Sequence, residues 1–314
     1  MKRICISDLI ERDIGVSAAQ LSHMAEHADA LYRRRRINGR VIDVPSLELK
    51  LVQCWVSDFL RAVDPIVPSC VTAYEKGCSI VANASAHCGH AHILSVDIKD
   101  FFHSCGQQLV WRLFASLTVD FGDGKRRRRL SPEECDLMVR LTCYKGALSV
   151  GASSSPAIAN RIMVPHDESI TRRIPFSMSY TRYSDDMTFS SDAWIDVPTV
   201  VNLVSDVISV DGFRLNERKT KCAGKKDRRV VTGLVVRPDD RLSIGAKRKS
   251  HIKHDLYELL THGEGDPLAV LGILYFAIQV EPDWAAAVLA KYANYGIARE
   301  KGVVGALRDM VGNS

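Results

Sequence analysis

The chain has 314 residues, 46% of them hydrophobic and 25% charged, which is typical of a globular protein with two or three subdomains. It contains no run of about 18 apolar residues, becomes charged too early for a signal peptide, and holds nine cysteines without a CxxC pair. These features argue against a membrane protein or a disulfide framework, and they predict a cytoplasmic protein with reduced thiols.

Positive charge is concentrated in one part of the chain. Residues 214–254 hold 14 Lys and Arg against four Asp and Glu, so the other residues together are net negative although the whole chain carries +5. Two shorter basic runs occupy residues 33–36 and 125–129. Charge segregated in this way favours a polyanionic partner, although many basic runs are only solvated loops.

The first part of the chain is expected to be mainly helical. Helical patterns cover residues 1–30, 46–63 and 107–117. Ser17 is expected to be an N-cap within the first of these segments, and Ser131 begins a further helix. A basic hairpin that turns at Asn38 and Gly39 follows the first helical segment, with Arg40 as a candidate phosphate ligand. A short apolar strand over residues 93–98 delivers Asp97 at its end.

Four side chains of types that bind zinc occur close together, at His87, Cys88, His90 and His92. Their spacing matches no familiar zinc finger, and no second ligand pair follows in the sequence. A hydrogen-bonded structural role is therefore the better interpretation of His87.

The second part begins with a loop of small residues, 146–156, whose glycines let the backbone approach a base pair or a phosphate closely. Ser155 and Pro156 cap the next helix, which Pro165 should kink or end. Beyond it we expect a helix, a turn with a basic edge, one strand and three more helices, over residues 197–210, 212–221, 230–236, 247–261, 267–279 and 282–295.

Asp185 and Asp186 stand together inside a run of strand-forming residues, 179–190. Adjacent carboxylates repel, so the pair suits the tip of a tight hairpin where a divalent cation relieves the repulsion, and oxygen ligands favour Mg²⁺ or Mn²⁺. An isolated pair would more simply be a solvated turn. Here, however, Asp97 ends an earlier strand, and carboxylates from separate strands are what two-metal phosphoryl transfer requires. Asp97 and Asp185 would bridge the ions, Asp186 would support them, and Lys219 could protonate or neutralise pyrophosphate.

Six sequence elements in order resemble those of reverse transcriptases, and specifically of bacterial retron reverse transcriptases, over about residues 35 to 290. Four are similar to polymerase motifs A to D, and they occupy residues 97–102, 151–160, 183–186 and 212–220. Two are typical of retron enzymes, namely the NAxxH sequence at residues 83–87 and the VTG triplet at residues 231–233. The YxDD sequence of motif C is weaker support alone than all six elements together.

The resemblance implies an α+β right-hand polymerase fold, with an antiparallel sheet and helices in the palm. It implies an N-terminal helical segment at residues 1–30, fingers at 31–92 and 104–165, a palm at 93–103 and 166–237, and a helical, RNA-binding thumb at 238–314.

The resemblance also implies roles for single residues. Asp97, Asp185 and Asp186 would bind two Mg²⁺ ions, or Mn²⁺, and Lys219 would assist catalysis. Three residues would contact the incoming dNTP, namely Arg40, Phe102 and Gly151. Phe102 would be a steric gate that excludes a ribose 2′-hydroxyl. RNA contacts are expected from Asn83, His87, Val231, Thr232, Gly233, Lys247, Arg248 and Lys249.

The implied reaction copies part of a cognate non-coding RNA into multicopy single-stranded DNA, primed from the 2′-hydroxyl of an internal guanosine. The implied partners are this RNA and its DNA product, dNTPs, a separate effector protein in anti-phage defence, and a host RNase H, because no RNase H-like domain is visible. Two positions depart from the family pattern. Val150 replaces a glutamine and cannot hydrogen-bond the nucleotide, and Ser184 replaces the commoner alanine, which we expect to matter little.

Two alternatives stay open at this point. Another bacterial lineage, of the group II intron or diversity-generating type, is disfavoured by the NAxxH and VTG sequences and by the absence of maturase or endonuclease segments. A scaffold that binds RNA or an effector, with polymerisation secondary, is disfavoured by the three aspartates, because buried like charges are costly without a cation.

Overall fold

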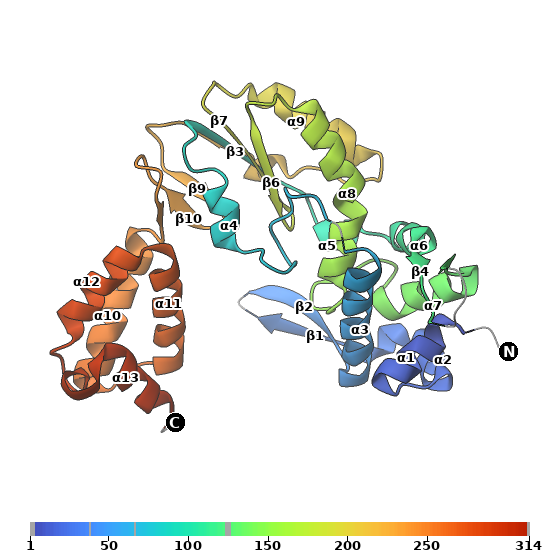
Figure 1. Ribbon diagram of the computed structural model, residues 1–314, viewed down its shortest axis with the longest axis horizontal. Coiled ribbons are helices and arrows are strands. Elements are labelled where there is room, and N and C mark those ends of the chain that lie inside the picture. Colours follow the sequence, from blue (N-terminus) through green and yellow to red (C-terminus); the bar gives the residue numbers. More distant parts are fainter. Residues whose placement is uncertain (1–3, 38, 66, 123–126, 313–314) are drawn as a thin grey trace. The chain divides into compact units, whose positions relative to one another are not determined.

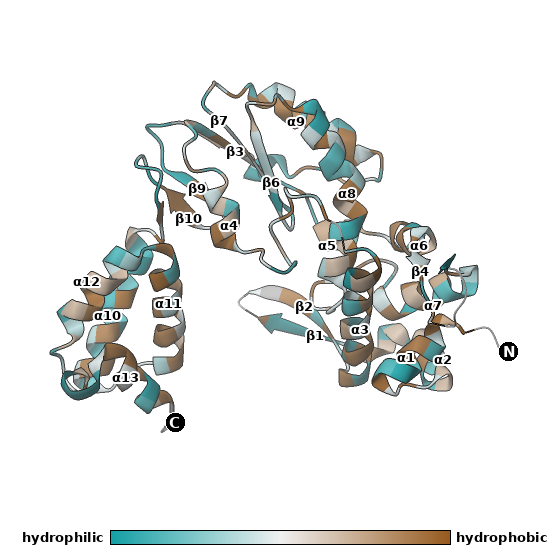
Figure 2. Ribbon diagram, viewed as in Figure 1, coloured by the Kyte–Doolittle hydropathy of each residue, from teal (hydrophilic) through white to brown (hydrophobic). Residues whose placement is uncertain are grey.

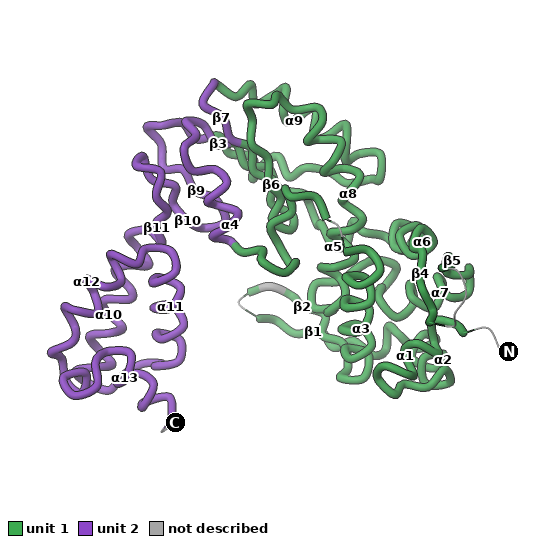
Figure 3. Tube along the Cα trace, in the orientation of Figure 1, with its two compact units in different colours: residues 1–79, 94–189, 194–222 green, residues 80–93, 190–193, 223–314 purple. Residues whose placement is uncertain are grey.

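The computed structural model describes residues 4–37, 39–65, 67–122 and 127–312 (Figure 1). The chain divides into two compact units, which Figure 3 colours separately. Unit 1 comprises residues 1–79, 94–189 and 194–222, and unit 2 comprises residues 80–93, 190–193 and 223–314. Both contain helices and short strands, which confirms the expected α+β class. No helix in the described ranges is both long and apolar enough to cross a membrane.

Unit 1 combines helices with small sheets. Its helices are α1 (Ile6–Ile14), α2 (Ala18–Glu26), α3 (Leu47–Val63), α5 (Phe101–Ser104), α6 (Gln107–Ser116), α7 (Pro132–Thr142), α8 (Ser155–Arg173) and α9 (Val197–Ser209), with 3-10 turns η1 (Ala28–Leu31) and η2 (Glu217–Lys219). Antiparallel pairs join β1 (Tyr32–Ile37) to β2 (Arg40–Pro45) and β4 (Thr118–Val119) to β5 (Arg128–Arg129). A four-stranded sheet has the order β6 (Ser179–Tyr183), β7 (Asp186–Ser191), β3 (His92–Asp97) and β8 (Lys221–Ala223).

Serine N-caps begin two helices of unit 1 as expected. Ser17 Oγ accepts a backbone N–H bond at the start of α2, and Ser131 Oγ accepts one from Glu134 at the start of α7. Glu134 also holds the first helix in place, because its carboxylate accepts two bonds from Arg128 and one from the backbone N–H of Ile6. These contacts tie α1 to α7.

Of the two outcomes expected at Pro165, a kink or an end of the helix, the end does not occur, because α8 continues past the proline. The helix continues to Arg173. The two residues after the proline make long-range contacts that hold this half in place: His166 Nδ1 lies 3.2 Å from the carbonyl of Val207, and Asp167 pairs with Arg182. Such contacts offset the backbone hydrogen bond that proline removes.

Unit 2 contains a small sheet and a group of helices. The helices are α4 (Ile80–Ser85), α10 (Ala246–His262), α11 (Pro267–Val280), α12 (Pro282–Tyr292) and α13 (Ala298–Gly312). The sheet has the order β11 (Leu242–Ser243), β10 (Leu234–Val236) and β9 (Arg229–Val231). The three C-terminal helices expected from the sequence correspond to α10, α11 and α12.

The expected single strand over residues 230–236 is wrong. The structure has two strands there, β9 and β10, paired antiparallel with Val231 opposite Leu234. Thr232 and Gly233 form the turn, with φ angles of 44° and 79°. A two-residue turn with positive φ at both positions matches the right-handed twist of its strands, and glycine adopts one of these conformations without strain.

Each unit has its own hydrophobic core. Leu60 and Phe114 are completely buried in unit 1, as are Ile252 and Leu274 in unit 2. Figure 2 shows the contrast between the mostly hydrophobic α11 and the hydrophilic β1, whose four arginines are all exposed.

Candidate active site

Strand β3 brings Asp97 to its C-terminal end, as the sequence predicts. Asp97 is only 4% exposed and lies between the buried neighbours Val96 and Ile98. Two backbone bonds fix this strand end, because Asn216 N–H donates to the carbonyl of Asp97 at 2.7 Å and Ile98 N–H donates to the carbonyl of Asp185 at 2.9 Å. The Asp97 backbone is therefore held beside the turn that carries Asp185.

The predicted hairpin is formed by β6 and β7, and its turn consists of Ser184 and Asp185. Asp186 is the first residue of β7 and is exposed. Ser184 is buried, with a φ of 61°, a left-handed conformation that few residues other than glycine adopt. The turn thus depends on contacts that hold Ser184 in this conformation.

The three aspartates influence one another electrostatically. Burial raises the pKa of Asp185, and the charge of Asp97 adds to this effect. Although Asp186 as a whole residue is exposed, partial desolvation of its carboxylate raises its pKa to about 6, and the charges of Asp185 and Asp97 add to this shift. Lys219 Nζ donates to Asp97 Oδ2 at 2.7 Å, and this bond raises the pKa of Lys219. The structure therefore brings together all four residues that we expected to be catalytic.

This donor set fits magnesium or manganese. Carboxylate oxygens are the ligands that such hard cations prefer, and a cation would offset the burial and the mutual repulsion that raise the pKa values of Asp185 and Asp186. Within the described residues, no three His, Cys, Asp or Glu side chains form a ready-made metal site. The fit therefore rests on the chemistry and mutual influence of the three carboxylates.

A buried ion pair between Arg182 and Asp167, which the sequence did not predict, supports the β6–β7 hairpin. Arg182 and Asp167 are both completely buried, and Arg182 donates to Asp167 through Nε at 2.9 and 3.0 Å and through Nη2 at 2.7 Å. Tyr180 Oη donates to the same carboxylate at 2.8 Å. Arg182 Nη1 reaches Asn160 Oδ1 at 3.2 Å and the carbonyl of Ser184 at 3.1 Å. Burial lowers the pKa of Arg182, but Asp167 outweighs burial and leaves it raised, so the arginine stays charged.

The residues expected to contact the nucleotide lie in separate elements of unit 1. Arg40 begins β2, but its side chain lies outside the described part of the structure. Phe102 is half-buried in α5, and its ring centre lies 5.4 Å from that of Phe101. Gly151 has a φ of 119°, and a Cβ there would lie 2.5 Å from the carbonyl oxygen of Asp43 in β2. Gly151 is thus required for close packing against β2, in addition to any contact with a nucleotide.

The NAxxH and VTG sequences face each other inside unit 2. Asn83 and His87 are completely buried, and His87 Nδ1 lies 2.7 Å from Ser190 Oγ, which confirms its hydrogen-bonded structural role. Asn83 Nδ2 donates to Thr232 Oγ1 at 3.3 Å. Val231 is buried, whereas Gly233 is exposed. The prediction that these residues contact RNA stays a prediction, and the structure gives the buried members a supporting position.

The basic residues at the start of α10 differ in their surroundings. Lys247 is exposed, whereas Arg248 Nη1 donates to the carbonyl of Gly233 at 2.8 Å. Lys249 Nζ lies 2.6 Å from Glu281 Oε1. Arg248 therefore links α10 to the β9–β10 turn, and the expected RNA contacts of all three side chains remain predictions.

Comparison with known proteins gives a consistent result. Residues 34–236 match the family model described as reverse transcriptase (RNA-dependent DNA polymerase). The chain is 31% identical over 244 residues to the Retron Ec86 reverse transcriptase of Escherichia coli, which covers 77% of this chain and 72% of that protein. It is 30% identical over 271 residues to the Retron Ec83 reverse transcriptase of Escherichia coli, covering 82% and 84%. It is also 30% identical over 262 residues to the Retron Mx162 reverse transcriptase of Myxococcus xanthus, covering 73% and 53%.

Among solved structures, the apo telomerase of Candida tropicalis is similar with a TM-score of 0.51 at 11% identity. The likeness covers 89% of this chain and 61% of the telomerase chain, so this chain spans less than two thirds of that protein. At such low identity the likeness concerns the fold alone, and it supports the expected polymerase fold. The family match over more than half of the chain, with the identity to several retron enzymes, shows that the chain belongs to the reverse transcriptases and, among them, to the retron reverse transcriptases.

Proposed function

We propose that Asp97, Asp185 and Asp186 hold two magnesium ions, or manganese, and form the centre at which deoxynucleotides are added. The observation that carries the proposal is the arrangement of Asp97 beside the Ser184–Asp185 turn in a chain of this family. Two bound cations would activate the attacking hydroxyl and stabilise the leaving pyrophosphate. Lys219 supplies a positive charge next to Asp97, which suits it to protonate or neutralise the pyrophosphate.

The test is to replace Asp185 with asparagine and measure dNTP incorporation on a primed RNA template with Mg²⁺. We expect the loss of essentially all activity, because asparagine keeps the size of the side chain but removes its charge. Asp206→Asn, at an exposed position in α9, is the matched control and should keep wild-type activity. Wild-type incorporation by Asp185→Asn would disprove this assignment.

We further propose that Arg40, Phe102 and Gly151 line the nucleotide site. Phe102 would exclude a ribose 2′-hydroxyl by its bulk, and Arg40 would bind the triphosphate through charge-assisted hydrogen bonds. The backbone of Gly151 would approach the nucleotide, while Val150 has no side-chain group that could hydrogen-bond it. This assignment rests on family likeness together with the packing of the 146–156 loop against β2.

The template, we propose, is part of a cognate non-coding RNA, which is copied into multicopy single-stranded DNA from the 2′-hydroxyl of an internal guanosine. This proposal rests on the retron relatives. The concentration of positive charge in residues 214–254 suits a nucleic acid partner. We assign RNA contacts to exposed and basic groups around the β9–β10 turn and α10. Asn83 and Val231 would support that turn from inside, and His87 would support the same unit through its bond to Ser190.

The template proposal is tested by purifying the protein from its own host and analysing the nucleic acid bound to it. The sample is treated separately with RNase and with DNase, and the surviving material is sequenced. A discrete single-stranded DNA joined to RNA through a linkage that debranching enzyme cleaves would support the proposal. RNA alone, with no DNA made after dNTPs and Mg²⁺ are supplied, would contradict it and favour a scaffold.

By family likeness we also propose a role in anti-phage defence with a separate effector protein, and template removal by a host RNase H. Adding RNase H to a purified reaction should then change the length of the nucleic acid product.

Asp185→Asn should abolish defence in cells if DNA synthesis is required. Defence that survives this change would show that binding, rather than polymerisation, is the protective function. We also propose that residues 31–92 and 104–165 form the fingers, residues 93–103 and 166–237 the palm, and residues 238–314 the thumb.

A further inference from the structure

A segment that the proposed function does not use lies against the catalytic hairpin. We call residues 70–78, between α3 and α4, the strap. Arg182 N–H in β6 donates to the carbonyl of Cys70 at 2.7 Å, and Thr72 N–H donates to the carbonyl of Arg182 at 2.9 Å. Val71 and Arg182 form a parallel bridge. The strap therefore pairs with β6 immediately before the Ser184–Asp185 turn.

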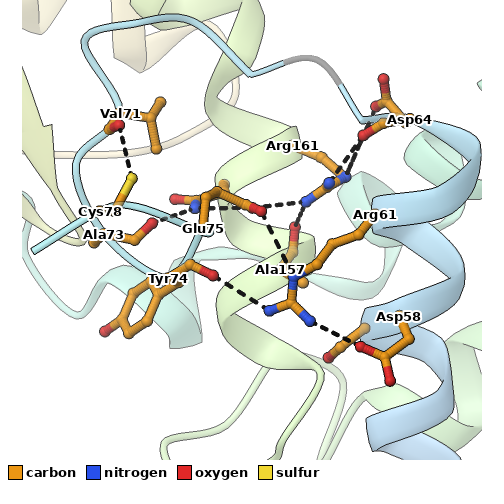
Figure 4. A network of polar contacts seen from close by, with 12 residues as sticks. Asp58, Arg61, Asp64, Val71, Ala73, Tyr74, Glu75, Cys78, Ala157 and Arg161 are labelled. Atoms are coloured by element: carbon orange, nitrogen blue, oxygen red, sulfur yellow. Dashed lines mark hydrogen bonds and ion pairs between the residues drawn. The ribbon is translucent and has the colours of Figure 1, made fainter.

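The strap is held firmly on its other side by α8. Glu75, whose side chain is only 11% exposed, accepts a bond from Arg161 Nη1 at 3.0 Å (Figure 4). Arg161 is itself buried and also donates to the carbonyl of Asp64 at 2.9 Å. Asn160 Nδ2 donates to the carbonyl of Ala73 at 2.9 Å. Two consecutive residues of α8 thus fix the strap on either side of Tyr74.

Arg61 of α3 adds a second anchor to the same part of the strap. Its Nη2 donates to the carbonyl of Tyr74 at 3.2 Å, and its Nε lies 3.6 Å from Glu75 Oε2 (Figure 4). The backbone of Tyr74 is therefore held by α3, while its neighbours Ala73 and Glu75 are held by α8.

Tyr74 is an unusual residue in this frame. Its φ is 65°, a conformation that is rare for a bulky side chain and that persists where the surrounding contacts enforce it. Its hydroxyl lies 3.1 Å from Ser184 Oγ, to which it donates. Ser184 has a left-handed backbone too, with a φ of 61°. Two strained residues, 110 positions apart in the chain, therefore contact each other at the catalytic turn.

We propose that Tyr74 is a positioning residue for nucleotide addition, acting through Ser184 on the orientation of Asp185. Ser184 is held at two points, since Arg182 binds its carbonyl and Tyr74 binds its hydroxyl. Fixing both groups sets the direction in which the chain leaves Ser184, and hence where the Asp185 carboxylate points. The inference rests on the proposed role of Asp185. It also assigns a purpose to the serine that replaces the commoner alanine in this turn.

A double-mutant cycle tests this directly, with Tyr74→Phe, Ser184→Ala and the two combined. Each single change removes one hydroxyl of the pair without changing the shape of the side chain greatly. We expect the single-turnover rate of dNTP incorporation to fall about 2- to 10-fold in each, as for one neutral hydrogen bond. The double variant should be no slower than the slower single variant, and the Kd for dNTP should stay at its wild-type value.

Ser209→Ala is the matched control, because Ser209 is an exposed residue of α9 whose hydroxyl donates one hydrogen bond of 3.0 Å, to the carbonyl of Asp206, outside the proposed site. It should leave the rate unchanged. The proposal is overturned by a wild-type rate in Tyr74→Phe, by losses that multiply in the double variant, or by a fall in rate matched by a fall in the thermal midpoint. A polymerising Asp185→Asn variant would instead show that the assignment of Asp185 fails, whatever the behaviour of Tyr74.

Discussion

Replacing Asp167 with asparagine removes the charge that faces Arg182 in the interior of unit 1. Asp167 accepts bonds from Tyr180 Oη and from Nε and Nη2 of Arg182, at 2.7 to 3.0 Å, and both members of the ion pair are completely buried. In the asparagine variant the amide NH₂ group would face a donor of Tyr180 or Arg182, so one of these hydrogen bonds would be lost. The guanidinium charge of Arg182 would also be left without its counterion. Removing one partner of a buried pair costs about 3–5 kcal/mol. We expect this loss in the free energy of unfolding of unit 1.

Urea unfolding followed by tryptophan fluorescence measures the effect of Asp167→Asn. In a Trp284→Phe background the remaining tryptophans all lie in unit 1, so the signal reports on that unit. The urea midpoint should fall by about 1–2 M. Glu168→Gln is the control, because Glu168 forms an exposed pair with Arg172 on the same helix and should shift the free energy by less than about 0.5 kcal/mol. A midpoint for Asp167→Asn equal to that of the control would refute the reasoning.

Three further predictions concern single residues. Gly151→Ala should destabilise unit 1 and raise the KM for dNTP, because the new Cβ would meet the carbonyl of Asp43. Gly146→Ala is the control, since φ is also positive there but nothing lies within 4 Å of the new Cβ, and it should destabilise unit 1 less. Equal thermal midpoints of the two variants would contradict this prediction. Burial lowers the pKa of His87 to about 4, so this histidine is neutral in the fold. As pH falls from 6.5 toward 4, the unfolded chain gains a proton at His87 that the folded chain does not, so the free energy of unfolding of unit 2 should fall by up to about 3 kcal/mol. Trp284 fluorescence measures this loss, which should be absent in the His87→Gln variant. Phe102→Ala should lower discrimination against ribonucleotides at least about 10-fold in competition assays, and unchanged discrimination would disprove the steric gate.

The central features of the site could be predicted because their signals are local. Asp97 follows an apolar run, and Asp185 and Asp186 interrupt a strand-forming run, so their positions at strand ends follow from the sequence nearby. The serine caps of α2 and α7 are equally local, since an N-cap contacts backbone only three residues away. Signals of this kind do not depend on how distant segments meet.

The supporting contacts could not be predicted because they join residues far apart in the chain. Arg182 lies in a strand-forming run, and nothing in the sequence near it identifies Asp167 as its partner. Ser184 stands out only as a serine where alanine is commoner, and nothing in the sequence connects it to Tyr74. The β9–β10 hairpin was missed because valines flank Thr232 and Gly233 and favour continuous strand, whereas the turn is set by backbone conformation at two residues.

The attachment of the β1–β2 hairpin has a consequence for engineering this enzyme. The hairpin is fixed by the Asp43 N–H bond to the carbonyl of Val150 and by the bond from Gln53 Nε2 to Tyr32 Oη, at 3.1 and 2.7 Å. Of the exposed arginines of residues 33–36, Arg34 donates through Nε to Asp43 Oδ1 at 3.1 Å, whereas the other three take part in none of these bonds. Replacing Arg33, Arg35 or Arg36 therefore changes the surface charge of the hairpin without removing either bond that attaches it to the rest of unit 1.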